Sequence, residues 1–241
     1  MTIEAFGITD MGLKRTNNED AYVAKPEMGF CALADGMGGA AAGEIASRVF
    51  VDTSQEVFSA HDQFSLDEGS SLIQKVFSLA NQRILDHVMD YPQHKGMGCT
   101  AELIAFAGDS FILGHMGDSR TYRLRQGELK QLSRDHSLVQ DQLDQGIITP
   151  EQAKNHAHKN VILRAVGVDI NPALDIIRGK MFPGDLFLLC SDGLSDMVDD
   201  DAIASVLSTS ADLEEMGTEL IEAAKRGGGK DNITVVLVLI E

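Results

Sequence analysis

Apolar runs, most of them bounded by glycine or aspartate, divide the chain into strand-like segments. The predicted strands cover residues 3–9, 29–35, 100–107, 110–118, 120–126, 185–192 and 233–241. A tight turn at 107–110 predicts a hairpin, and a second turn at 125–130 leads into a short strand that ends near Leu132. Strands joined this tightly must run antiparallel.

Helix-like periodicity separates these strands over residues 42–60, 69–90 and 211–226. In the second segment the apolar positions fall on one stripe, so this helix is expected to cover a sheet; they are Leu72, Val76, Leu79, Ile84 and Val88. No internal repeat and no low-complexity linker interrupts the pattern. We therefore expect residues 1–241 to form a single α+β domain.

Residues 133–168 are more polar and contain only short helical pieces. Thr149 and Pro150 have the character of an N-cap followed by a proline in the first helical turn. The segment is predicted to be a small helical insertion between strands. An insertion of this size is either a mobile cover over a site or an inert excursion, and the pattern favours neither.

The composition and net charge of the chain limit the partners that it is expected to bind and the cell compartment in which it is expected. The chain has 241 residues, is 44% hydrophobic and carries a formal net charge of -17 from 37 acidic and 20 basic residues. This charge repels nucleic acid and anionic membrane surfaces, so neither is an expected partner. No apolar stretch approaches the ~20 residues of a membrane helix, and the first residues lack signal-peptide character. A cytoplasmic monomer is expected.

Three cysteines, an odd number, each lie among apolar or small residues, so we expect buried free thiols; they are Cys31, Cys99 and Cys190. No arginine follows any of them at six positions, which excludes thiol-based phosphatase chemistry.

Carboxylates recur beside glycine or asparagine in turn-like segments, and several of them end apolar runs: they are Asp35, Asp118, Asp192 and Asp231. Asp20, with Glu19 beside it, is a fifth candidate. Singly, each is explained as a turn residue that caps its own backbone. Together they favour a hard divalent cation, Mg²⁺ or Mn²⁺, because oxygen ligands without a Cys/His cluster do not suit zinc. Calcium stays open, although no contiguous calcium-binding loop is present.

Two arginines lie near these acidic groups. Arg15, in the segment KRTNNED, is a candidate phosphate ligand, because a guanidinium binds phosphate oxygens bidentately. Arg120, in the segment GDSR, is instead expected to brace its loop. The acidic run 199–201 is interpreted as a solvated helix start.

Six ordered segments now resemble one family: GLKRTNNEDA, ADGMGG with AAGEIAS, GHMGDSRTY, LSRDHSL, LLCSDGLSD and GGGKDNITVV. In this order, across positions 12 to 236, they resemble the metal-dependent protein phosphatases of the PPM family, protein phosphatase 2C, in their compact bacterial form. The resemblance implies a four-layer αββα sandwich of two antiparallel sheets flanked by helices. Residues 133–168 would be its variable flap.

By motif position, the resemblance also implies the roles of the site residues. Asp35 would bridge two ions, the Gly36 carbonyl would complete one coordination shell, and Asp192 and Asp231 would hold the second ion. Asp20 and Glu19 would orient bound water or touch a metal, with Asp196 a further outer-shell candidate. Asp118, helped by Asp192, would carry a third, weaker ion. Arg15 would bind the substrate phosphate.

The implied function is that of a signalling enzyme, a protein serine/threonine phosphatase that opposes a Ser/Thr kinase. Metal-activated water would attack the phosphomonoester of phosphoserine or phosphothreonine proteins directly, with no phosphoenzyme. Two alternatives stay open: a catalytically impaired metal-binding regulatory module of the same fold, and a phosphatase of a small phosphorylated metabolite.

One departure from the family concerns the loop after Asp35. Relatives carry a histidine two or five positions later, where this chain has Met37 and Ala40. His115 is expected to be a packed histidine, because it points away from Asp118 on a regular strand. Without the usual proton donor, we expect aryl phosphates to be cleaved relatively better than phosphoserine peptides.

Overall fold

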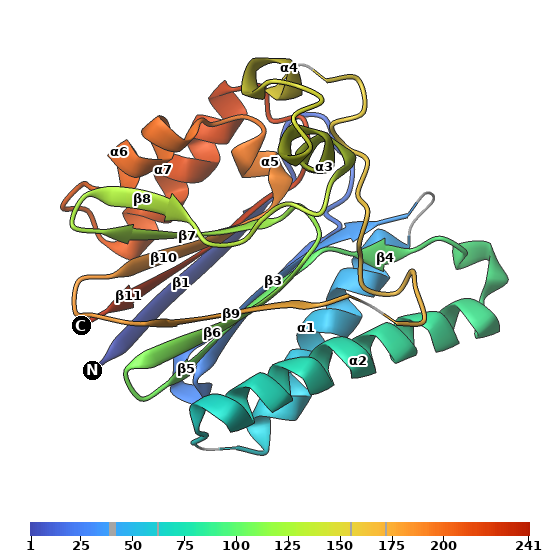
Figure 1. Ribbon diagram of the computed structural model, residues 1–241, viewed down its shortest axis with the longest axis horizontal. Coiled ribbons are helices and arrows are strands. Elements are labelled where there is room, and N and C mark those ends of the chain that lie inside the picture. The colour runs from blue at the N-terminus through green and yellow to red at the C-terminus, as the bar shows by residue number, and fades with distance from the viewer. Residues whose placement is uncertain (39–41, 62, 155, 172) are drawn as a thin grey trace.

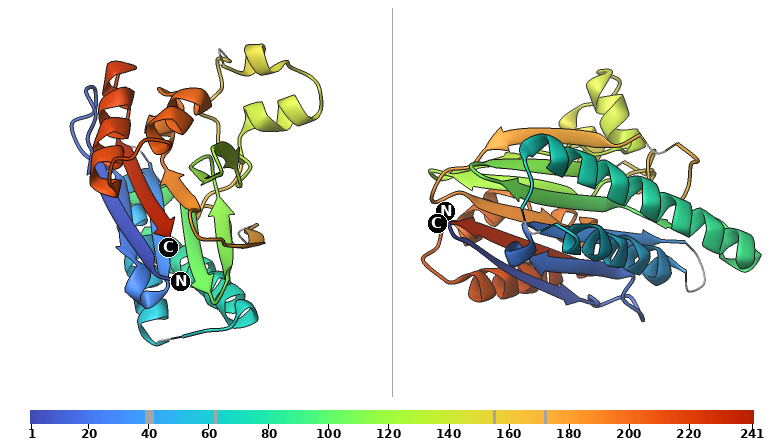
Figure 2. Two further views of the ribbon diagram at one scale, coloured as in Figure 1. Left: turned by 90° about the vertical axis from the view of Figure 1, so that its left-hand side faces the viewer. Right: turned by 90° about the horizontal axis from the view of Figure 1, so that it is seen from below.

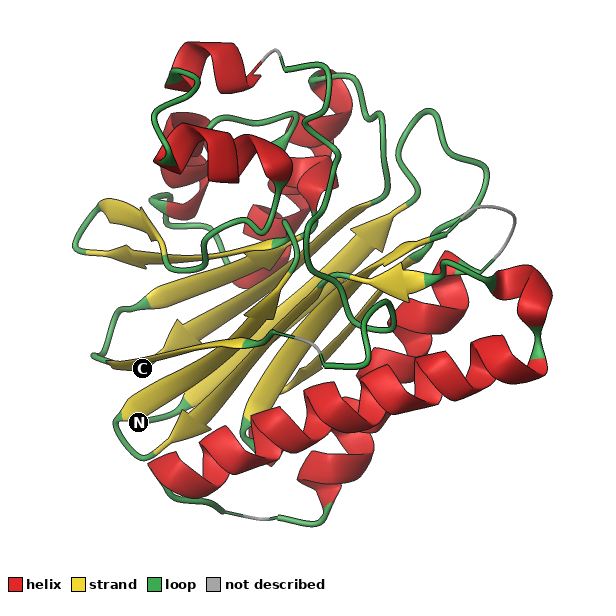
Figure 3. Cartoon of the chain, turned by 45° about the vertical axis from the view of Figure 1, so that its right-hand side comes forward, coloured by secondary structure: helices red, strands yellow, loops and turns green. Residues whose placement is uncertain are grey.

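A computed structural model of the chain describes residues 1–38, 42–61, 63–154, 156–171 and 173–241. The described strands form two antiparallel sheets that face each other, with helices on both outer sides (Figures 1 and 3). The first sheet has the order β1-β11-β10-β7-β8, and the second has the order β2-β3-β5-β6-β9, with β4 paired to β3. This is the predicted four-layer sandwich.

The strands agree with most of the predicted runs, and three strands, β2, β4 and β9, were not predicted. Their bounds are β1 Ile3–Asp10, β2 Asp20–Lys25, β3 Phe30–Met37, β4 Gly98–Cys99, β5 Ala101–Ala107, β6 Ser110–Met116, β7 Arg120–Arg125, β8 Glu128–Gln131, β9 Asp175–Lys180, β10 Leu186–Cys190 and β11 Ile233–Ile240. Both predicted hairpins are present, between β5 and β6 and between β7 and β8.

The three long predicted helices are confirmed. The helices are α1 Gly43–Ser59, α2 Leu66–Asp90, α3 Leu138–Asp144, α4 Pro150–Lys154, α5 Asp192–Ser195, α6 Asp200–Leu207 and α7 Leu213–Arg226, with short 3-10 turns η1 Pro26–Met28 and η2 Pro92–His94. α2 begins earlier than predicted because Ser65 and Glu68 form a capping box. Asp199 caps α6, as predicted for the acidic run.

Three apolar clusters fill the spaces between the four layers. α1 and α2 pack on the second sheet around Phe50, Phe58 and Ile84, and α6 and α7 pack on the first sheet around Leu220. The middle cluster lies between the sheets and includes Phe187. Because each sheet is covered on both faces, its central strands are continuously apolar.

All three cysteines are buried and free, as predicted. No helix in the described residues is long and apolar enough to cross a membrane. The segment between β8 and β9 carries α3 and α4, and both views of Figure 2 show these helices projecting beyond the sandwich. Thr149 precedes α4 and accepts a hydrogen bond from the backbone of Gln152 (3.3 Å), as the predicted N-cap requires.

Candidate metal centre

The five candidate aspartates lie at strand ends on one edge of the sandwich, opposite the two termini (Figure 1). Asp20 begins β2 and is the direct partner of Asp35 on β3. Asp118 lies in the turn between β6 and β7, Asp192 begins α5 directly after β10, and Asp231 precedes β11. Antiparallel order places these ends at the same edge, so residues from both sheets meet there.

Among the candidate aspartates, Asp35 and Asp192 have the most strongly raised pKa values, first because they are buried and then because other carboxylates lie close to them. Burial raises the pKa of Asp35 well above its ordinary value, and repulsion from Asp20 and Asp192 raises it further. Burial likewise raises the pKa of Asp192, with added repulsion from Asp118 and Asp231. Like charges held this close are costly without a cation among them.

The pKa values of two neighbouring carboxyls, those of Asp20 and Asp118, are also raised, but by less. Burial raises the pKa of Asp20 to about 6, although hydrogen bonds from Thr234 and Ser191 oppose the shift. Burial, followed by repulsion from Asp135, raises the pKa of Asp118 to about 7. The acidic edge therefore has the electrostatics of a cation site.

Unsatisfied oxygen atoms identify where a cation would be accepted. Asp20 Oδ1 and Asp192 Oδ1 are buried and have no hydrogen-bond partner in the described residues. Buried acceptors of this kind are rare without a ligand. Among the described residues, no group of three or more Asp, Glu, His or Cys side chains is arranged to hold a metal ion by itself. Mg²⁺ and Mn²⁺ fit such a site, because Mg²⁺ in particular keeps several waters beside one or two carboxylates.

Gly36 allows the backbone to approach the site closely. Its N–H donates to the Glu19 carbonyl (3.1 Å), and a Cβ at this position would lie 2.2 Å from the Gly43 carbonyl oxygen. Only glycine fits here. The Glu19 side chain accepts a hydrogen bond from Asn17 (3.0 Å), which occupies one of its two oxygens.

Arg15 reaches this edge from the loop between β1 and β2. Its Nη2 donates to Asp231 Oδ2 at 2.5 Å, and about half of its side chain is exposed to solvent. The guanidinium is thus both fixed beside a candidate metal ligand and open to an incoming anion.

Asn232 ties the Arg15 loop to the last strand. Its Nδ2 donates to the carbonyls of Met11 (3.1 Å) and Asn17 (2.9 Å), and its Oδ1 accepts from the Glu19 N–H (2.9 Å). The asparagine uses all the hydrogen-bonding groups of its side chain except one acceptor lone pair. The sequence reading did not assign Asn232 a role, although it stands directly after Asp231.

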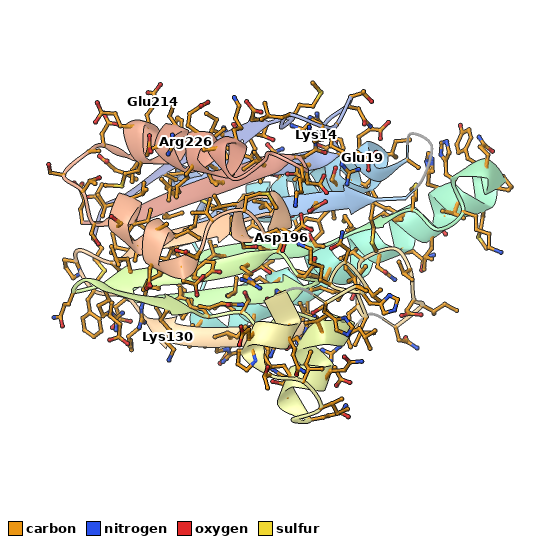
Figure 4. The ribbon with its side chains drawn as sticks, turned by 90° about the horizontal axis from the view of Figure 1, so that it is seen from above. Lys14, Glu19, Lys130, Asp196, Glu214 and Arg226 are labelled. Atoms are coloured by element: carbon orange, nitrogen blue, oxygen red, sulfur yellow. The ribbon has the colours of Figure 1, made fainter. Side chains whose placement is uncertain are left out.

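A cleft of about 670 Å³ opens beside Asp118 and Asp192. Residues of α3 and α4, including Val139 and Leu143, line this cleft together with the acidic run 199–201. Asp196, labelled in Figure 4 near the middle of this end, lies at the cleft and pairs with Lys159 of the segment between β8 and β9. Its charge also adds to the raised pKa values of Asp118 and Asp192, for which burial is the first cause.

The histidine next to Asp118 in sequence is packed, as predicted. His115 is fully buried, pairs with Glu102 and donates from Nε2 to the Arg134 carbonyl (2.8 Å). His136 accepts from the Gly117 N–H (3.2 Å). Met37 ends β3, and Ala40 lies outside the described residues. The predicted role of Arg120 is also confirmed, because it braces its loop by a fork of bonds to Asp135.

Known proteins resemble the chain over almost its whole length. A family model described as protein phosphatase 2C matches residues 14–237. The serine/threonine protein phosphatase PstP of Mycobacterium tuberculosis is 43% identical over 234 residues, which are 95% of this chain and 43% of that protein, so the chain spans less than half of that relative. Protein phosphatase PhpP of Streptococcus pneumoniae is 36% identical over 234 residues, 96% of this chain and 95% of that protein.

Solved structures agree. The crystal structure of the Mycobacterium tuberculosis phosphatase PstP/Ppp superposes with a TM-score of 0.93 at 38% identity and covers 100% of both chains. The catalytic domain of PstP in complex with two manganese ions gives a TM-score of 0.88 at 39% identity, covering 98% of this chain and 97% of that one. With its fold, its ordered motifs and its acidic edge in agreement, the chain belongs to the protein phosphatase 2C family.

Proposed function

We propose that the chain is a metal-dependent protein serine/threonine phosphatase. The observation that carries the proposal is the pair of buried, unpartnered oxygens of Asp20 and Asp192 at an edge where Arg15 is also exposed. An anion-binding guanidinium beside a cation-binding carboxylate group suits a phosphate ester. The named activity of the relatives supports the same reaction.

The acidic edge would hold two to three Mg²⁺ or Mn²⁺ ions. Asp35, the Gly36 carbonyl, Asp192 and Asp231 would provide the ligands of two, with Asp20 and Glu19 beside them. Asp118 would hold a third ion, with Asp196 in its outer shell. Bound divalent ions lower the pKa of water and screen charge on phosphoryl oxygens, which permits direct hydrolysis without a phosphoenzyme.

Arg15 would bind the phosphate of the substrate. Its Nη2 donates to Asp231, and the other four guanidinium N–H groups make no hydrogen bond that the structure records, so phosphate oxygens can be bound without breaking the ion pair. This arrangement would place the phosphorus next to the carboxylates and would hold it there as the charge on its oxygens changes.

The substrates would be phosphoserine and phosphothreonine proteins, with a Ser/Thr kinase as the opposing enzyme. Residues 199–201, which line the cleft, are acidic, and the residues of α3 and α4 that line it are partly apolar. Substrates with basic residues near the phosphorylated position suit such a cleft, because a long basic side chain has an apolar stem and a charged end. We further propose that residues 1–241 act as one cytoplasmic, monomeric domain in which 133–168 is the flap.

The decisive experiment measures Mn²⁺-dependent phosphate release from a phosphothreonine peptide. Asp35→Asn is expected to remove the activity, because it removes the central carboxylate while keeping the side-chain volume. Asp212→Asn is the matched control: Asp212 is an exposed N-cap of α7 that asparagine also satisfies, and α7 packs on the outer face of the first sheet. Activity that persists in Asp35→Asn, or that does not need a divalent ion, would refute the proposal.

A further inference from the structure

The two oxygens of Asp20 have different surroundings. Oδ2 accepts hydrogen bonds from Ser191 Oγ (2.8 Å) and Thr234 Oγ1 (2.6 Å). Oδ1 is buried and has no partner in the described residues. The two hydroxyls therefore fix the rotation of the carboxylate and leave Oδ1 as the oxygen available to a ligand.

A chain of donors leads to this carboxylate from the surface of the protein. Thr234 gives its single hydroxyl proton to Asp20, so in the 2.6 Å contact between Thr9 and Thr234 it is Thr9 that donates. Thr9 Oγ1 in turn accepts from Asn18 Nδ2 (2.8 Å), and Asn18 Oδ1 accepts from the Asp20 N–H (3.0 Å). The four residues close a ring in which each side-chain donor points toward Asp20 Oδ2.

Ser191 is oriented by the same strand. The Thr234 N–H donates to Ser191 Oγ (3.0 Å). The serine proton has two acceptors within reach, and Asp20 Oδ2 at 2.8 Å is nearer than the Asn232 carbonyl at 3.4 Å. Ser191 occupies the N-cap position of α5 and makes no side-chain capping bond there. A serine at this position ordinarily accepts from the first turn of its helix, so its use as a donor to Asp20 is a specific arrangement.

The register of the sheet holds the ring together. Thr9 on β1 is the direct partner of Thr234 on β11. Thr234 and Ser191 are fully buried, whereas Thr9 is exposed. A surface threonine on an edge strand is thus connected to a carboxylate of the metal centre through one buried hydroxyl.

We propose that Thr9, Thr234, Ser191 and Asn18 are positioning residues that present Asp20 Oδ1 to the metal centre. The proposal rests on the proposed function, because it assumes that the centre binds divalent ions. Its direct consequence is that a surface substitution on β1, which touches no ligand, weakens metal binding. Partners of metal ligands in other proteins affect affinity in this way.

Thr9→Val tests this consequence with little disturbance, because valine has the shape of threonine without the hydroxyl. We expect the Mn²⁺ dissociation constant to rise about three- to tenfold, one step weaker than the roughly 10- to 100-fold typical of groups that contact a ligand directly. Thr234→Val, which removes such a group, is expected to reach that larger range. Thr9→Ser keeps the donor and should bind as the wild type does.

The measurement is calorimetric titration of EDTA-stripped protein with MnCl₂, so it does not depend on turnover. Thr2→Val is the matched control, since it makes the same change immediately before β1 at the opposite end of the strand. Urea midpoints in EDTA, measured for each variant, establish that the fold is intact.

Weaker binding in Thr9→Val and in Thr234→Val, with Thr9→Ser and Thr2→Val unchanged, supports the ring. Wild-type affinity in Thr9→Val, as when water replaces the hydroxyl, overturns it, and so does equal weakening by Thr9→Ser. A wild-type protein that binds no Mn²⁺ refutes the metal centre itself, and this result is distinct from the others.

Discussion

Replacing Asp118 with asparagine should stabilise the metal-free protein at alkaline pH. Burial, with repulsion from Asp135, raises the pKa of Asp118 from 3.8 to about 7. A shift of about three units at 1.36 kcal/mol each corresponds to ~4 kcal/mol of destabilisation when the carboxyl is ionised. The buried asparagine amide needs a hydrogen-bond partner of its own, and its desolvation cancels part of this stabilisation. We expect a net increase in the free energy of unfolding of about 2 kcal/mol.

The pH dependence gives the sign of this effect. A carboxyl whose pKa is higher in the folded state destabilises the fold above the folded pKa, and the penalty disappears as the pH falls toward the unfolded pKa. The advantage of Asp118→Asn should therefore be largest at pH 8 and nearly absent near pH 4. For a chain of this size, about 2 kcal/mol corresponds to an increase in Tm of roughly 4–8 °C.

Urea unfolding followed by circular dichroism, in EDTA at pH 8 and pH 4, measures the difference. Addition of Mn²⁺ should then stabilise the wild type more than the variant, because only the wild type keeps every carboxylate. Asp185→Asn is a control of opposite sign. Asp185 is buried far from the acidic edge, and although burial opposes the shift, hydrogen bonds from Arg125 lower its pKa. Its contribution to stability is present above the unfolded pKa and is lost as the pH falls through the lower folded pKa.

Two results would show that the reasoning about Asp118 is wrong. One is an Asp118→Asn protein that is less stable than the wild type in EDTA at pH 8. The other is a stability difference that is the same at pH 8 and pH 4, since a purely steric effect would not depend on ionisation. Either result would mean that neither burial nor the neighbouring Asp135 penalises the ionised Asp118 carboxylate appreciably.

Three further predictions concern catalysis and the buried histidine. Arg15→Lys should lower kcat/KM for a phosphothreonine peptide about 10- to 100-fold, because lysine cannot bind phosphate and Asp231 together through a planar fork. Steady-state kinetics at saturating Mn²⁺ measure this loss, and a change below about threefold contradicts the prediction. Burial opposes protonation of His115, but the neighbouring Glu102 outweighs burial and raises the pKa of the histidine to about 8. The stabilisation from the charged imidazole is therefore fully present below the unfolded pKa of 6.5 and is lost as the pH rises through about 8. The stability lost in His115→Gln, measured by urea unfolding, should thus be larger at pH 6 than at pH 9, and the opposite order would refute it. With Met37 in place of a histidine, aryl phosphates should be cleaved relatively better than phosphoserine peptides, and equal or inverted efficiency in parallel assays would contradict this.

The central strands were predictable because they are buried on both faces and therefore form continuous apolar runs, whereas their arrangement in a four-layer sandwich was implied by the resemblance to the family. β2, β4 and β9 were not predicted, and each has a physical reason. β4 has only two residues, too few for a pattern of apolar positions to show. β2 is a short, half-polar strand that ends at Pro26, and β9 alternates partly buried and exposed residues at a sheet edge. The early start of α2 had a recognisable signal, Ser65 followed by Glu68, which the periodicity alone did not show.

Asp35, Asp118, Asp192 and Asp231 were predictable because each lies at the end or the beginning of an apolar run, and strand ends collect at one edge. Asp20 begins the half-polar strand β2 and was a candidate only through its segment, with Glu19 beside it. The hydroxyls that support Asp20 were not predictable, since serine and threonine are common in strands and turns for many reasons. Only the register that places Thr9 opposite Thr234, across 225 residues of sequence, turns an ordinary surface threonine into a neighbour of Asp20.

The acidic edge is closed by contacts between the beginning and the end of the chain. Arg15 pairs with Asp231, Asn232 holds the loop that carries Glu19, and Thr9 bonds to Thr234. These contacts form only when β1 pairs with β11, so completion of the site and closure of the first sheet are the same structural event. A cation that binds the carboxylates therefore stabilises that closure, because ligands that bind only the native state shift the folding equilibrium toward it. The repulsion among the aspartates, which weakens this edge without metal, becomes the source of its response to metal.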